Sequence, residues 1–167
     1  MVVNKLYKNL MEHWKKYGYS VYKNQDLSEA GKNDCEELYL NDPLEAEVKN
    51  QLATELIEMF FGNNDRQYVD DNIINYLNSN PLVRYYFAFE EKLNVYIKEG
   101  LISKNNIFSA AQNYLLDSDD VEGIKFALSL LRYCANEEAE EILKAFSNHN
   151  EFIFYCIEGL KEYDKCN

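Results

Sequence analysis

Two histidines and four cysteines are the residues of this sequence that most often carry catalysis or bind metals. His13 and His149 occur in no HExxH or ExxH pattern, which would place two ligands on one face of a helix. The cysteines form no CxxC pair with metal-ligand spacing. No GxSxG motif, glycine-rich phosphate loop or Cys-His nucleophile motif occurs either. We therefore expect a protein that is not an enzyme and that holds no metal and no cofactor.

The same residues have simpler structural roles. His13 falls at the edge of the apolar face of the first predicted helix, where we expect a hydrogen-bonded structural histidine. His149 lies in the turn Ser147-Asn148-His149-Asn150, where we expect a helix cap or a surface residue. Widely spaced cysteines predict free thiols in a reducing cytoplasm. They are Cys35, Cys134, Cys156 and Cys166.

The carboxylates separate into two groups. Those in the first turns of predicted helices, such as Asp119 and Glu137, meet the helix dipole favourably and need no functional explanation. Glu47, Glu55 and Glu58 differ, because at 100 degrees per residue they share an arc of about 80 degrees that contains no lysine. Like charges on one helix face repel by a few tenths of a kcal/mol per close pair, which a basic partner would relieve. An ordinary solvated helix face is the alternative.

We call the candidate contact face on this predicted helix the acidic stripe. It consists of Glu47, Gln51, Glu55 and Glu58. The stretch before it strengthens the negative field, since residues 26–47 contain eight acids and one lysine.

A second candidate lies in the aromatic stretch RYYFAFEE, residues 84–91. Most apolar side chains of this predicted helix fill one arc of roughly 100 degrees and therefore belong to the core. Phe87 instead projects among Glu91, Asn94 and Lys98, and Glu90 lies at the margin of the apolar face. Either a neighbouring helix covers Phe87, which we favour, or Phe87 is an exposed aromatic that anchors a partner. Phe87 and Glu91 therefore complete the predicted partner-binding set.

Overall charge narrows the class of partner. The chain has 167 residues, a formal net charge of −12 and a pI of about 4.6. Phosphate binding needs clustered lysine and arginine, so we expect no nucleic-acid partner and favour a basic protein. High net charge also keeps proteins soluble, which is the simpler explanation. Residues 1–23 carry +4, and the rest of the chain carries −16.

Membrane association is not expected either. The first residues alternate apolar and polar side chains at helical spacing, whereas a signal peptide needs an unbroken apolar core. No apolar run approaches the roughly 18 residues that a bilayer-spanning helix needs. We therefore predict a cytoplasmic protein.

The sequence predicts only helices, which must therefore position the candidate partner-binding residues. Apolar residues recur at spacings of three and four, and the chain has only six glycines and two prolines. Helices are predicted over about 3–17, 34–40, 43–61, 66–77, 81–99, 104–116, 119–133, 137–146 and 150–163. The candidate caps are Asp42, Ser103, Ser118, Asn136 and Asn148.

The fold class is therefore all-α, with about eight to nine helices in a single domain over 1–167. We divide it into N-terminal helices (1–62), central helices (63–100) and C-terminal helical hairpins (101–167). Short connections force successive helices into antiparallel hairpins. Ser103 and Asn136 begin comparable helices 33 residues apart, which is typical of a helical-pair solenoid. An irregular bundle around one central helix, which would be 119–133, is the alternative.

The run DDVEGIKFALSLLRYCANEEAEEILKAFSNHNEFIFYCIEGL, residues 119–160, resembles HEAT-like helical repeats. The small size, acidity and lack of catalytic motifs are similar to those of immunity proteins from bacterial polymorphic and contact-dependent toxin systems. That resemblance implies stoichiometric inhibition of a basic toxin domain, such as a nuclease, by an acidic surface. No motif residue transfers from it. The alternative is a helical-repeat scaffold or adaptor for another protein or a peptide, and the oligomeric state stays open.

Overall fold

A computed structural model describes residues 7–8, 11–12, 15–16, 44–62, 71–147, 149 and 151–165, and the structural statements below concern these residues. The paired residues 7–8, 11–12 and 15–16 are helical and lie within the predicted first helix. His13, Cys35, Cys166, the predicted caps Asp42 and Asn148 and the predicted helix over 34–40 lie outside the described residues.

All regular structure in the described residues is helical, which confirms the all-α class. The elements are α3 (Ala46–Phe61), α4 (Asp71–Ser79), the 3-10 helix η2 (Leu82–Tyr85), α5 (Tyr86–Lys98), α6 (Lys104–Asp117), α7 (Val121–Leu131), α8 (Glu137–Phe146) and α9 (Ile153–Asp164). These are seven α-helices in the described part, slightly fewer than the eight to nine predicted for the whole chain.

Two of the predicted caps are confirmed. The side chain of Ser103 accepts a hydrogen bond from the backbone N–H of Asn106, and Asn136 accepts one from Ala139. The prediction that Ser118 caps the next helix is wrong, because Asp120 caps α7 through Gly123.

Ser118 instead binds the backbone just before the helix. Its Oγ accepts the backbone N–H of Asp120 at 3.1 Å.

Helix starts are the less accurate predictions. α3 begins at Ala46, three residues later than predicted, and α9 begins at Ile153, also three residues late. The helix predicted over 81–99 is interrupted, since η2 precedes α5 and Tyr85 leaves helical geometry at φ −137° and ψ 23°. The Tyr85 hydroxyl donates to the carbonyl oxygen of Asn80, which holds this turn.

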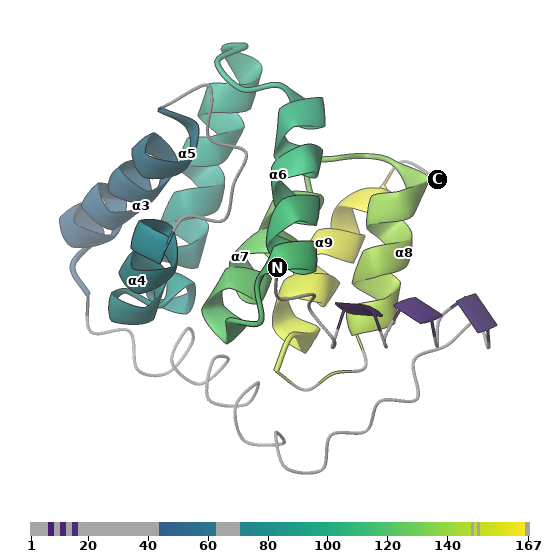
Figure 1. Cartoon of the computed structure of the whole chain (residues 1–167). Coiled ribbons are helices and arrows are strands. Elements are labelled where there is room, and N and C mark those ends of the chain that lie inside the picture. The colour runs from purple at the N-terminus through teal and green to yellow at the C-terminus, as the bar shows by residue number, and fades with distance from the viewer. Residues whose placement is uncertain are drawn as a thin grey trace.

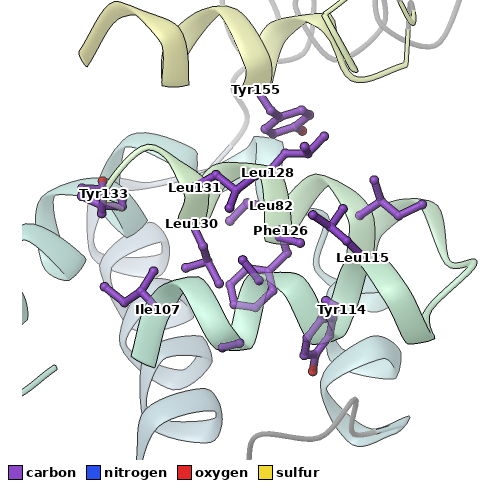
Figure 2. Packing of buried hydrophobic residues seen from close by; sticks show 14 of the residues in the cluster. Leu82, Ile107, Tyr114, Leu115, Phe126, Leu128, Leu130, Leu131, Tyr133 and Tyr155 are labelled. Atoms are coloured by element: carbon purple, nitrogen blue, oxygen red, sulfur yellow. The ribbon is translucent and has the colours of Figure 1, made fainter. Parts of the chain in front are cut away.

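α7 is the centre of the fold. It packs against α6, α9, α4, α8 and η2, and in Figure 1 it lies between the group α3–α5 and the pair α8–α9. Every residue from Gly123 to Leu131 is buried, so this helix is covered on more than one side. Figure 2 shows Phe126 and Leu130 beside the side chains of α6, while Leu128 lies toward Tyr155 of α9.

An aromatic cluster joins α7 to three other helices. The ring of Phe126 lies 4.8 Å from Phe60 of α3, 5.8 Å from Phe89 of α5 and 5.8 Å from Tyr114 of α6, all edge to face. α7 therefore packs against both earlier and later elements of the chain. The finer HEAT-like repeat assignment stays a prediction.

One charge is buried within α7. Lys125 is 3% exposed, and its Nζ lies 3.1 Å from Glu122 and 3.0 Å from Glu151. Two carboxylates therefore compensate a cation that would otherwise be costly to remove from water. This cluster ties α7 to the turn that precedes α9.

Candidate functional site

The acidic stripe lies along α3, as its spacing predicts. Glu47, Gln51 and Glu58 are exposed, and Glu55 is half-buried. One oxygen of Glu55 accepts from the amide of Gln51 at 3.0 Å, and the other accepts from the hydroxyl of Tyr76 on α4 at 2.9 Å. The absence of a lysine from the arc therefore does not leave Glu55 without partners, because its hydrogen bonds hold the contact between α3 and α4.

The two ends of the stripe remain open to solvent. Neither Glu47 nor Glu58 forms an ion pair with another described residue. The carboxylates that a partner could reach on α3 are therefore these two, separated by three helical turns.

Phe87 is 48% exposed, so the favoured prediction that a neighbouring helix covers it is wrong. Its ring contacts that of Tyr86 edge to face at 5.5 Å. Tyr86 turns inward instead, where it meets the rings of Phe154 and Tyr155 of α9. α5 thus packs on α9 through Tyr86 and on α7 through Phe89, and leaves Phe87 facing water.

Glu91 lies one turn after Phe87 on the same side of α5. It is exposed and forms no ion pair with any described residue. An aromatic ring and an open carboxylate therefore occur together, and we call Phe87 and Glu91 the α5 pair. The acidic stripe lies on α3 and the α5 pair on α5, two helices that pack against each other, so we treat them as two candidate contact surfaces.

A charged network beside the α5 pair was missed in the sequence. Arg132, which follows α7, contacts the carboxylate of Glu90 on α5 through Nη1 and that of Glu162 on α9 through Nη2, the latter at 2.7 Å. Lys165 also contacts Glu162, at 2.8 Å. Separations of 42 and 30 residues leave no local signal by which the sequence could indicate this network.

The pKa values of the two carboxylates in this network, Glu90 and Glu162, are shifted in opposite directions. Burial raises the pKa of Glu90, and the nearby Glu158 adds to this, while the Tyr86 hydroxyl and Arg132 oppose it. Hydrogen bonds from Lys165 and Arg132 lower the pKa of Glu162. Glu162 is therefore the better-stabilised anion.

A pocket opens next to Arg132. Its volume is about 380 Å³, within the range of small-ligand sites, and residues of α5, the start of α6, the segment after α7 and the end of α9 line it. The charged lining residues are Lys98, Lys104, Arg132 and Glu162.

The described cysteines and histidine are buried and do not line this pocket. Cys134 and Cys156 are buried free cysteines, and burial raises the pKa of Cys134 to about 12, which disfavours the thiolate at neutral pH. His149 is 1% exposed and its ring lies against Phe152, so the expectation of a surface residue is wrong. Within the described part, no group of three or more histidine, cysteine or acidic residues could hold a metal ion.

Across the residues that the structure describes, no helix combines the length and apolarity that crossing a membrane requires.

Comparisons with known proteins assign no family to the chain. No protein-family model, no curated protein and no solved structure matches the chain.

Proposed function

We propose that this chain is an immunity-type inhibitor that binds and neutralises a basic toxin domain in the cytoplasm by stoichiometric, non-enzymatic contact. The observation that carries the proposal is the α5 pair, an aromatic ring 48% exposed beside an open carboxylate in a chain of net charge −12. Aromatic side chains dominate the energy of protein interfaces, and open carboxylates favour lysine and arginine opposite them.

The acidic stripe has a different role in this proposal. Glu47 and Glu58 are exposed and strengthen the negative field, which accelerates the approach of a positively charged protein. Phe87 then supplies the short-range contact that slows dissociation. The two surfaces therefore act on different rate constants, which makes the proposal testable in parts.

The test begins with a partner of known origin. The reading frame upstream should encode a large secreted protein with a variable C-terminal domain, and that domain is the toxin to be purified. Association and dissociation rates are then measured at several salt concentrations. We expect a 1:1 complex that abolishes the toxin's activity and an association rate that falls steeply with salt.

Three variants separate the surfaces. Phe87→Ser should raise the dissociation rate by about 30-fold, which corresponds to a hot-spot loss of about 2 kcal/mol. The double variant Glu47→Gln/Glu58→Gln should slow association and flatten its salt dependence. The charge-matched control Asp117→Asn/Glu137→Gln changes exposed acids of other helices. It should reduce the association rate and its salt dependence less than the α3 double variant does.

Two outcomes would overturn the proposal. A complex whose association does not depend on salt, but which still needs Phe87, would favour the adaptor hypothesis. A complex that leaves the toxin fully active would exclude inhibition.

A further inference from the structure

The pocket beside Arg132 differs in charge from the rest of the protein. Its lining includes the cations of Lys98, Lys104 and Arg132 and one carboxylate, that of Glu162, whereas the whole chain carries a net charge of −12. The pocket therefore has a local positive excess in an acidic protein. Such a contrast favours an anionic ligand at this position.

The positive excess comes from the two lysines. Arg132 is already neutralised, since Glu90 and Glu162 both contact its guanidinium. Lys98 and Lys104 are exposed, and neither forms an ion pair with a described residue. Their ammonium groups are available to a ligand.

The start of α6 adds to this field. Lys104 is the first residue of α6, after the cap Ser103. Backbone N–H groups in the first turn of a helix carry partial positive charge, which favours an anion nearby. At Lys104 the lysine charge and the dipole of α6 act in the same direction. The C-terminal ends of α5 and α9 also line the pocket and oppose the α6 dipole, so the two lysines are the main source of attraction for an anion.

The remaining wall of the pocket is largely apolar. Ile97 of α5, Tyr133 and Ala135 after α7 and Tyr163 of α9 line the pocket, and its volume is about 380 Å³. This volume exceeds what an inorganic ion needs and suits a small organic molecule with an apolar body.

We propose that this pocket binds a small organic carboxylate, with the carboxylate held by Lys98 and Lys104 and the apolar body against Ile97 and the two tyrosines. The inference is independent of the proposed inhibitor function, since it uses neither the α5 pair nor the acidic stripe.

The experiment uses the full chain and defined probes. Benzoate and hexanoate are titrated against it by NMR and calorimetry, with benzamide as the neutral analogue of benzoate and inorganic phosphate as an anion without an apolar body. We expect both carboxylates to bind with dissociation constants of about 1 mM or below and to shift the resonances of Ile97 and Tyr163. Benzamide and phosphate should bind at least about tenfold more weakly.

The variant Lys98→Gln/Lys104→Gln changes two exposed side chains and should weaken benzoate binding at least about tenfold. The control Lys92→Gln/Lys144→Gln alters net charge equally and should bind as the native chain does. The proposal is overturned by no response to either carboxylate at about 10 mM. Equal binding of benzamide or phosphate, or unchanged binding to the pocket variant, would also overturn it.

Discussion

The guanidinium of Arg132 contacts the carboxylate of Glu90, which lies 42 residues earlier in the chain. Arg132 also contacts Glu162, so one side chain after α7 ties α5 to α9. The side chains of Arg132 and Glu90 are 16% and 11% exposed, whereas that of Glu162 is 34% exposed. The two ion pairs should therefore contribute unequally to stability.

Replacing Arg132 by Met should lower the free energy of unfolding by about 2 to 4 kcal/mol, because it leaves the carboxylate of Glu90 buried without a cation. Glu162→Gln should cost less than about 1 kcal/mol, as exposed pairs do. Urea unfolding of both variants measures the difference. Equal losses would show that the burial of Glu90 is not what makes the first pair important.

The double variant Glu90→Gln/Arg132→Met provides the control. Removing both charges should recover part of the loss seen in Arg132→Met. Without Arg132, burial and Glu158 are opposed only by the Tyr86 hydroxyl, so the pKa of Glu90 rises further above its ordinary value of 4.5. A raised carboxyl pKa means that the folded state binds more protons, so the stability of Arg132→Met should fall as the pH rises from 4.5.

Phe87 and Phe89 form a matched pair on α5. Phe89 is fully buried against Phe126, so Phe89→Ala should lower the free energy of unfolding by about 3 to 5 kcal/mol. Phe87→Ala should cost less than about 1 kcal/mol, because half of that ring already faces water. Thermal or urea unfolding decides this. Equal losses would place Phe87 in the core and remove the basis of the α5 pair.

Helix periodicity and caps are local signals, and they predicted the C-terminal half of the fold well. α8 lies where the sequence places it, with Asn136 as its cap, and α7 lies within the helix predicted over 119–133. Helix starts were less accurate where a side chain competes with the helix. Tyr85, whose hydroxyl bonds back to Asn80, is the clearest example.

The candidate site depended on contacts between distant segments, which no local pattern encodes. Spacing placed Glu55 correctly on the acidic stripe but gave no sign of Tyr76 on α4. Likewise, the side of α5 that carries Phe87 was predicted, whereas its exposure depended on where α9 packs. Polar neighbours in the sequence suggested an exposed His149, but the ring lies against Phe152.

Ala135 has the only positive φ of a non-glycine residue in the described part, at 50°. Tyr163 lies beside this turn, since its hydroxyl donates to the carbonyl oxygen of Leu131 at 2.7 Å. Left-handed geometry costs an alanine about 1 kcal/mol. Ala135→Gly should therefore raise the free energy of unfolding by about 0.5 to 1 kcal/mol in urea titrations.

Gly100 provides the reverse substitution. Its φ is 73°, and an added Cβ would meet no atom within 4 Å, so Gly100→Ala tests backbone strain alone. We expect a loss of about 1 kcal/mol. If Ala135→Gly destabilised the protein while Gly100→Ala behaved as expected, the Cβ of Ala135 would have a packing role that outweighs its strain.

His149 should make stability depend on pH near neutrality. Burial lowers its pKa below the ordinary value of 6.5, so the unfolded state binds a proton more readily than the folded state does. The free energy of unfolding should therefore fall as the pH drops through 6.5. Urea unfolding between about pH 7.5 and pH 5.5 measures this, in the range where an ordinary histidine titrates.

Comparison with His149→Gln isolates this histidine from other titrating groups. Glu151, Glu122 and Lys125 form the buried ion cluster beside the same turn and are present in both proteins. His13 is likewise common to both. The variant should lose less stability than the native chain over the same pH range. Parallel curves for the two proteins would mean that the buried imidazole accepts a proton in the folded state as easily as in the unfolded state.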